Sequence, residues 1–308
     1  MDIATVYGQI SAPETTEDLI VRALGLYGEW SFAEQMLIAP LLRDKDRIWD
    51  AGAFLGTFGI GLTQLARIRP ANLVAVEPNP DILPHLKRNL ARNLTCPVEV
   101  APFAVGDSDI TLMRRDETGS GNAGGISYQP APDNKGTIAA KTLKELRARF
   151  GDYDFLKLDV EGMENQALRG DIEYLKSRQP VIWAECNEAE ESIALLEALV
   201  WLGYEPLYVA FPAFRAANFN GNAEKMYPIA YEAGLLAAPK DRLAAFTGKV
   251  PGEDIIVRPV KTSFDLRKAL FITPRWGQAD WVDMSKAELI ATLGRIATKQ
   301  ELVNFLNG

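Results

Sequence analysis

The residues best suited to chemistry are acidic side chains that close apolar runs along the first half of the chain. Asp50, Glu77 and Asp159 each follow or end such a run. In an open α/β sheet, the carboxyl ends of parallel strands meet at one edge, and ligands bind in the crevice beside that edge. We therefore expect these three carboxylates to surround one ligand.

A glycine-containing turn follows the first of these acids. Gly52 and Gly56 lie in the segment 47–56, and glycine at such positions allows backbone conformations or close approaches that a Cβ atom would obstruct. An apolar segment continues to Ile68 at a length that suits a helix, so the order is strand, loop and helix. The spacing is G-x-x-x-G, without the G-x-G-x-x-G fingerprint of dinucleotide enzymes, so a pyrophosphate ligand is poorly supported.

Glu77 is placed to accept hydrogen bonds from ribose hydroxyl groups, because it ends the second predicted strand about 20 residues past the glycine loop. S-adenosylmethionine offers a ribose and no phosphate. Its sulfonium and ammonium groups favour acidic surroundings such as Asp50 and Asp159, and its carboxylate suits the backbone amides of a helix start. Phe103 and Ala104, near the end of the third predicted strand, are expected to flank the purine ring. S-adenosylmethionine is therefore the cofactor we expect.

The segment 154–164 has the most unusual charge pattern. Lys157, Asp159 and Glu161 alternate within it, which predicts that all three point to one side of a strand. One interpretation is a structural network in which the lysine neutralises the acids. We favour a ligand site that includes Asp159 and Glu161.

An alternative ligand for these acids is a divalent metal ion. Asp159, Glu185 and Asn187 offer oxygen ligands for it. Acids at strand ends are also expected without a metal, and we expect none here.

Five apolar runs must position these residues, and they cover residues 47–50, 72–77, 98–105, 154–164 and 181–187. They are separated by helices or loops, which predicts an α/β, doubly wound sheet. Two further runs, 204–210 and 234–239, predict strands that pair antiparallel at one edge. Two predicted helices over 14–43 are joined by the linker 27–31. Its Tyr27 and Trp30 are interpreted as packing residues, and the alternative is that the linker closes over the loop at 50–56.

Composition limits the class of protein. The chain has 308 residues, 47% of them hydrophobic, and its 33 basic and 41 acidic residues give a formal net charge of −8. A negative chain repels a polyphosphate backbone, so we expect no nucleic-acid partner. No apolar run is long enough to span a membrane, and the amino terminus has neither a basic region nor a long apolar segment. Two cysteines and one histidine form no zinc signature, and we expect a cytoplasmic protein.

Several motifs resemble those of the FkbM-type S-adenosylmethionine-dependent methyltransferases. The successive motifs are DAGAFLG at 50–56, VEP at 76–78, AVGD at 104–107 and KLDVEGME at 157–164, of which the last is the most specific. Residues 27–30, 218–222 and 235–239 are also similar to that family, so the resemblance covers roughly 25–245. It implies a class I methyltransferase (Rossmann-like) fold, whose mostly parallel seven-stranded sheet has one antiparallel strand.

The resemblance also implies a function. Methyl transfer in this family is usually to a hydroxyl, often on a sugar or a biosynthetic intermediate, so a small-molecule or glycan acceptor is expected. For that reaction Asp159 is the candidate base that removes the hydroxyl proton, with Lys157 or Glu161 orienting it. Methyl transfer can also proceed largely by proximity, without a base, and a divalent metal is an alternative means of acidifying the hydroxyl. The predicted cofactor-binding residues are Asp50, Gly52, Ala53, Gly56, Glu77, Pro78, Phe103, Ala104 and Asp159. Two alternatives are a nicotinamide-dependent oxidoreductase, for which Glu77 would also bind a ribose, and a non-catalytic binding subunit that retains the fold.

Three parts are predicted: an N-terminal helical segment (1–46), the methyltransferase domain (47–247) and a C-terminal extension (248–308). The extension is expected to hold a short strand, a loop with Trp276 and Trp281, and terminal helices opened by a capping box of Ser285 and Glu288. We interpret it as a docking element or one that joins copies of the chain, and the alternative is a cover for the back of the sheet. We expect the loops 27–31, 114–136 and 211–228 to form the acceptor pocket.

Overall fold

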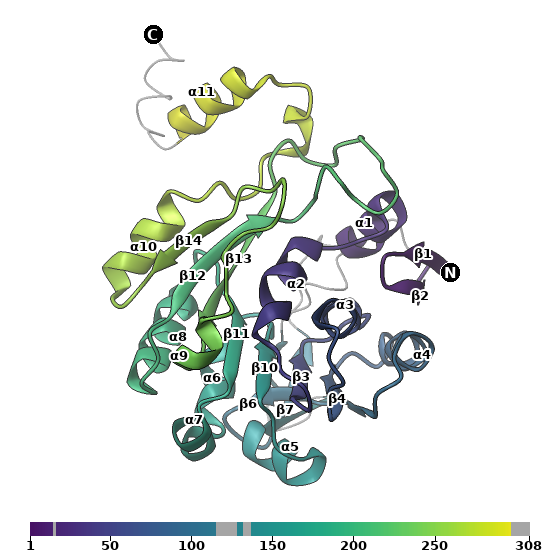
Figure 1. The fold of residues 1–308 in the computed structure, drawn as a ribbon, viewed down its shortest axis with the longest axis vertical. Helices are drawn as coiled ribbons and strands as arrows, with labels where there is room; N and C mark the ends of the chain where they lie inside the picture. Colours follow the sequence, from purple (N-terminus) through teal and green to yellow (C-terminus); the bar gives the residue numbers. More distant parts are fainter. Residues whose placement is uncertain (15–16, 115–127, 132–136, 297–308) are drawn as a thin grey trace.

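The structure is a computed structural model that describes residues 1–14, 17–114, 128–131 and 137–296 (Figure 1). Its centre is a sheet with the strand order β14-β12-β13-β11-β10-β3-β4-β5. These strands are β3 (Arg47–Ala51), β4 (Asn72–Val76), β5 (Val98–Ala101), β10 (Phe155–Leu158), β11 (Val181–Glu185), β12 (Leu207–Pro212), β13 (Tyr231–Ala237) and β14 (Ile256–Pro259).

The sheet confirms the predicted fold class. β5, β4, β3, β10 and β11 are parallel, and β13 lies antiparallel between β11 and β12. These are the seven predicted strands. The sheet has in addition β14, which the C-terminal extension contributes and which pairs antiparallel with β12 through Val257 and Val209.

Helices cover both faces of the sheet because the parallel strands are apolar on both sides. Trp49 and Leu156 pack into one core, whereas their neighbours Ile48 and Phe155 pack into the other. The first core is covered by α5 (Leu143–Phe150), α6 (Glu164–Arg169), α7 (Ile172–Arg178), α8 (Glu190–Trp201) and α10 (Ser263–Phe271). The second is covered by α1 (Leu19–Tyr27), α2 (Phe32–Ile38), α3 (Thr57–Ala66) and α4 (Leu83–Asn93), with the short turns η1 (Ala39–Leu41) and α9 (Lys240–Leu243) nearby.

The N-terminal segment is not wholly helical, contrary to the prediction. A hairpin of β1 (Asp2–Thr5) and β2 (Gly8–Ser11) precedes α1. The buried Asn89 on α4 holds it: its Nδ2 donates to the carbonyls of Ser11 and Leu55, and its Oδ1 accepts from the Ser11 amide. The hairpin was missed because its strands have only four residues each.

The predicted strand over 98–105 is wrong in its extent. β5 ends at Ala101, and the chain then enters a second sheet of order β6-β9-β7-β8. Pro102 accounts for the break, because it has no backbone N–H to donate to a strand ladder. The second sheet consists of β6 (Ala104–Gly106), β7 (Ile110–Arg114), β8 (Tyr128–Pro130) and β9 (Ile138–Thr142). Most of the loop predicted over 114–136 lies outside the described residues.

The C-terminal extension packs partly on the domain. β14 joins the sheet and α10 lies against α8, whereas α11 (Lys286–Ile296) stands apart at the top of Figure 1. The predicted capping box is present: the Ser285 amide donates to Glu288, and the Glu288 amide donates to the Ser285 hydroxyl. η3 (Ala279–Trp281) precedes it, and the predicted helix beyond Ile296 lies outside the described residues.

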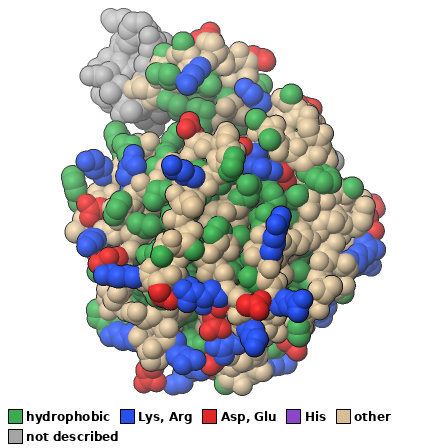
Figure 2. Space-filling view, in the orientation of Figure 1, with side chains coloured by type: hydrophobic (Ala, Val, Ile, Leu, Met, Phe, Trp, Pro, Cys, Tyr) green, Lys and Arg blue, Asp and Glu red, His purple; other side chains and the backbone are tan. Residues whose placement is uncertain are grey.

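On the face shown in Figure 2, acidic and basic side chains are interspersed over the lower part of the molecule. None of the helices in the described ranges combines the length and the apolar character that a membrane span requires.

Candidate active site

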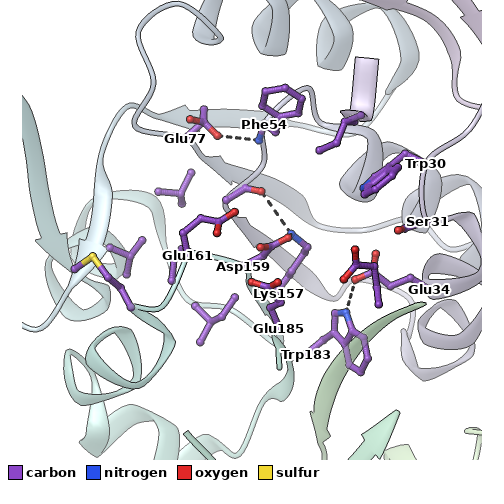
Figure 3. Close-up of a pocket in the computed structure, with 18 of the residues that line it drawn as sticks. Trp30, Ser31, Glu34, Phe54, Glu77, Lys157, Asp159, Glu161, Trp183 and Glu185 are labelled. Carbon is purple, nitrogen blue, oxygen red and sulfur yellow. Dashed lines mark hydrogen bonds and ion pairs between the residues drawn. The ribbon is translucent and has the colours of Figure 1, made fainter. Parts of the chain in front are cut away.

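The carboxyl ends of the central strands open into one cavity of about 370 Å³ (Figure 3). Most of the predicted site residues line it, namely Gly52, Glu77, Pro78, Phe103, Ala104, Lys157, Asp159 and Glu161. Three predicted cofactor residues, Asp50, Ala53 and Gly56, are not among its lining residues. The acids at the strand ends are therefore brought together as expected, and the glycine loop contributes only part of its length to the wall.

Glu77 is held rigidly at the end of β4. Its Oε2 accepts a hydrogen bond from the Phe54 amide at 2.8 Å, and its Oε1 accepts one from the Asn79 amide at 2.8 Å. A carboxylate has about four acceptor positions, so each oxygen keeps one for a ligand. Burial raises the pKa of Glu77 to about 7, and the two backbone amides oppose that rise.

Gly52 and Gly56 serve two different close approaches. A Cβ atom on Gly52 would lie 1.7 Å from the carbonyl oxygen of Asp159, so only glycine lets the loop after β3 touch the loop after β10. A Cβ atom on Gly56 would lie 2.9 Å from Leu86 of α4. Both residues also have positive φ angles, 82° and 81°. Gly56 therefore fixes the packing of α4 rather than the cavity wall.

Asp50 lies beneath the loop and is fully buried. Its Oδ2 accepts from the Gly59 amide at 3.2 Å, and its Oδ1 lies 3.7 Å from Lys157 Nζ. Burial raises the pKa of Asp50 to about 6, although the lysine opposes the rise. The expected direct contact of Asp50 with the cofactor does not fit this position. Asp50 instead ties β3 to α3 and to the lysine.

Lys157 connects the buried acid to the cavity. Its Nζ donates to Asp159 Oδ2 at 2.8 Å, and its side chain is 6% exposed. Burial lowers the pKa of Lys157, but the charges of Asp159 and Asp50 raise it more, so the lysine keeps its proton. The predicted structural network is thus present: Lys157 balances the acids and positions Asp159, whose side chain is 38% exposed. The role of Asp159 in a ligand site stays a prediction.

The predicted alternation over 154–164 is wrong beyond the end of β10. The strand ends at Leu158, and Glu161 has a left-handed backbone with φ of 53°. Glu161 still lines the cavity from this turn. Burial, with the neighbouring charges of Asp159 and Glu164, raises the pKa of Glu161 to about 8. Alternating charges continued past the point where the strand conformation stops, so spacing alone could not place Glu161.

The suggested metal ligands are not arranged as a set. Asn187 Oδ1 accepts from the Ala189 amide just before α8, whereas Glu185 and Asp159 face the cavity. In the parts of the chain that the structure describes, no three acidic, histidine or cysteine side chains form a group that could hold a metal ion.

Several cavity residues were missed by sequence reasoning. Glu34 on α2 accepts a hydrogen bond from Trp183 Nε1 at 2.5 Å, and Glu232 on β13 accepts one from Trp276 Nε1 at 3.1 Å. All four line the cavity. Trp276 had been noted only as part of the extension, and no local pattern marks Glu34 as a site residue.

The linker before α2 also reaches the cavity. Trp30 and Ser31 line it, which favours the interpretation in which this linker closes over the glycine loop. The adjacent Glu29 is buried and receives two hydrogen bonds of 2.7 Å from Arg215 and one from the Phe219 amide. This buried ion pair fixes the linker against the loop at 213–222.

Comparison with known families agrees with this geometry. A family model described as "Methyltransferase FkbM domain" matches residues 50–206, a little over half of the chain. The chain belongs to the FkbM methyltransferase family. The matched region of this FkbM methyltransferase runs from Asp50 through the loop that follows β10 and includes most of the residues at the cavity. No curated protein matches the sequence.

Solved structures resemble the chain weakly. The FkbM methyltransferase from Methylobacillus flagellatus KT is 17% identical, with 64% of this chain and 45% of that chain covered at a TM-score of 0.41. The precorrin-6y C5,15-methyltransferase from Geobacter metallireducens GS-15 is 16% identical, with 68% and 88% covered at a TM-score of 0.40. The chain spans less than half the length of the Methylobacillus flagellatus protein.

Family membership implies S-adenosylmethionine as the methyl donor, and the cavity fits this cofactor. Glu77 keeps an acceptor position on each oxygen at the place where a ribose is bound in doubly wound folds. Glu77, Asp159 and Glu161 line the cavity beside Gly52, and acidic surroundings suit a ligand with a sulfonium and an ammonium group. Phe103 and Ala104 provide apolar wall beyond Glu77.

Proposed function

We propose that this FkbM methyltransferase transfers a methyl group to a hydroxyl of a sugar or another small biosynthetic intermediate, with Asp159 as the base. The observation that carries the proposal is the position of Asp159: it lies at the end of β10, in the cavity, between Glu77 on one side and Glu185 on the other. One oxygen of Asp159 is bonded to Lys157, which leaves the other for an acceptor hydroxyl.

The cofactor would be held by Glu77 at the ribose and by the backbone of the loop at Gly52, with Phe103 against the base. Bound there, S-adenosylmethionine supplies an electrophilic methyl group. The protein then has to orient the acceptor oxygen in line with that group and receive its proton.

Asp159 is suited to the second task by its pairing with Lys157. The ion pair fixes the carboxylate in one direction, and the lysine, which keeps its proton, balances the charge when the acceptor loses its own. Glu161 lies in the same cavity, and its pKa of about 8 means that it holds a proton at neutral pH.

Labelled methyl transfer from S-adenosylmethionine into a panel of hydroxylated compounds tests this proposal, with mass spectrometry to locate the methyl group. We expect an O-methyl product, and we expect Asp159→Asn to lower kcat by about 100-fold while S-adenosylhomocysteine affinity changes little. Glu99→Gln, on the exposed surface of β5, is the matched control. Methylation at nitrogen or carbon only, or an unchanged kcat in Asp159→Asn, would contradict it.

A further inference from the structure

The cavity has an acidic end that the cofactor does not account for. It consists of Glu34 on α2, Glu185 at the end of β11 and Glu232 on β13, all of which line the cavity. Glu77 directly follows β4, and Phe103 follows the neighbouring β5. In the sheet, β3 and β10 lie between these two strands and the strands β11 and β13. Figure 3 shows Glu34 and Glu185 with Trp183 on the opposite side of Lys157 from Glu77. This end therefore faces the acceptor.

The charges at the acidic end are poorly balanced by the protein. Glu34 and Glu232 each accept one neutral indole N–H, and no hydrogen bond to the Glu185 carboxyl forms within the described residues. Lys157 is bonded to Asp159, and the nearby Arg275 lies 3.1 Å from Glu188 but 3.8 Å from Glu232. Burial raises the pKa of Glu34 to about 8, and burial with the surrounding carboxylates raises that of Glu185 well above its usual range.

A second observation at the same end indicates a ligand. Ser31 is 3% exposed and lines the cavity, yet its Oγ has no hydrogen-bond partner. Figure 3 shows this hydroxyl beside Glu34, facing the same space. A buried hydroxyl without a partner costs free energy unless a ligand supplies one. Such a ligand group must be polar and must fit between the serine and the carboxylates.

Indole rings form the remaining wall. Trp183 and Trp276 use their N–H groups to fix Glu34 and Glu232, and Trp30 stacks on Trp276 with ring centroids 6.4 Å apart. Because the N–H groups are occupied, the rings can offer only their faces and edges to a ligand. Indole faces attract cations more strongly than other aromatic side chains do.

We propose that the acidic end binds a cationic nitrogen of the acceptor, so that the substrate is a hydroxyl compound with an ammonium group, such as an amino sugar or an amino alcohol. This inference rests on the proposed function and narrows its substrate class. Among the described residues, a neutral acceptor would leave Glu34 and Glu185 without a paired cation and Glu232 with only the 3.8 Å contact to Arg275. An ammonium group would pair with the ionised carboxylates and donate to Ser31. The methylated hydroxyl would then lie toward Asp159.

Tryptophan fluorescence of the protein saturated with S-adenosylhomocysteine tests the proposal with two probes. 2-Aminoethanol carries a hydroxyl and an ammonium group, and 1-propanol has nearly the same shape without the charge. We expect 2-aminoethanol to bind at least about tenfold more tightly, and we expect Glu185→Gln and Glu232→Gln each to remove most of that preference. The exposed Glu205→Gln is the matched control and should keep it.

Equal binding of the two probes, no binding of 2-aminoethanol at tens of millimolar, or a preference that survives both glutamine variants would overturn the proposal. Calorimetry with S-adenosylhomocysteine keeps this result separate from the proposed function. If the cofactor product binds and neutral hydroxyl compounds are methylated, the enzyme is as proposed and only the cationic substrate class is wrong.

Discussion

Lys157 forms ion pairs with two acids, Asp50 beneath the glycine loop and Asp159 in the cavity. A pairing of this kind is costly to break from one side, because an uncompensated charge remains buried. Asp50 is fully buried. Within the described residues, it accepts one backbone hydrogen bond, from the Gly59 amide, and forms an ion pair with Lys157. Lys157 thus connects the stability of the loop to the orientation of the proposed base.

Replacing the lysine should therefore destabilise the protein in a pH-dependent manner. We expect Lys157→Met to lower the free energy of unfolding by about 3–5 kcal/mol at pH 8. The loss should be smaller near pH 5, where Asp50, with a pKa of about 6 that rises further without the lysine, takes up a proton. Urea unfolding measures both values.

The double variant Asp50→Asn with Lys157→Met is the control for this experiment, because it removes both charges together. It should recover much of the loss at pH 8. A loss below about 1 kcal/mol in the single variant would show that the pair contributes no more than an exposed ion pair does.

We expect the affinity for the cofactor to depend on pH through the ionisation of Glu77. Its pKa of about 7 lies above the ordinary value, so in the free protein the carboxyl is largely protonated at pH 6 and ionised at pH 8. A ribose diol donates hydrogen bonds, which the ionised form accepts best. We expect S-adenosylhomocysteine to bind about tenfold more weakly at pH 6 than at pH 8. Calorimetry across this range should show the change in wild type and a flatter profile in Glu77→Gln; equal slopes would exclude Glu77 as the titrating group.

The shape of the cavity depends on the contact between two loops, the one that follows β3 and the one that follows β10. We expect Gly52→Ala to destabilise the protein by more than about 2 kcal/mol, because a methyl group there meets the backbone of Asp159 and the φ angle is positive. Gly25→Ala is the matched control, since Gly25 lies within α1 with open space around it and should gain stability. Thermal unfolding compares the two. A Gly52→Ala protein as stable as wild type would show that the loops can separate.

The same elements show what the sequence could predict. Strands β3, β4, β10 and β11 are short apolar runs that end near acids, and such patterns are local, so the sheet and the gathering of Glu77 and Asp159 were predictable. Glu34 and Trp276 were not. Their place in the cavity depends on how α2 and the C-terminal extension pack on the sheet, which no local spacing encodes. The motif alone predicted that Asp50 contacts the cofactor. It could not show that Lys157 lines the cavity and pairs with an Asp50 that does not.

At the scale of the whole molecule, the C-terminal extension has two parts with different contacts. Trp276 belongs to the cavity wall, whereas α11 stands apart and exposes Ile290 by 63% and Leu293 by 36%. The predicted association of copies through the extension stays a prediction. We expect a chain that ends at residue 282 to keep its melting temperature and its affinity for S-adenosylhomocysteine but to lose any oligomer. Light scattering of both chains measures this, and an oligomer that persists without α11 would place the interface elsewhere.

We expect the cavity beside Glu77 to bind S-adenosylmethionine rather than a nicotinamide cofactor. Isothermal calorimetry measures the binding of S-adenosylhomocysteine and of NADH to wild type, to Glu77→Ala and to the exposed control Glu99→Ala. We predict micromolar binding of S-adenosylhomocysteine, at least about tenfold weaker binding in Glu77→Ala, an unchanged value in the control and no heat with NADH. Binding of NADH in preference to S-adenosylhomocysteine, or equal affinity in Glu77→Ala and wild type, would contradict the claim.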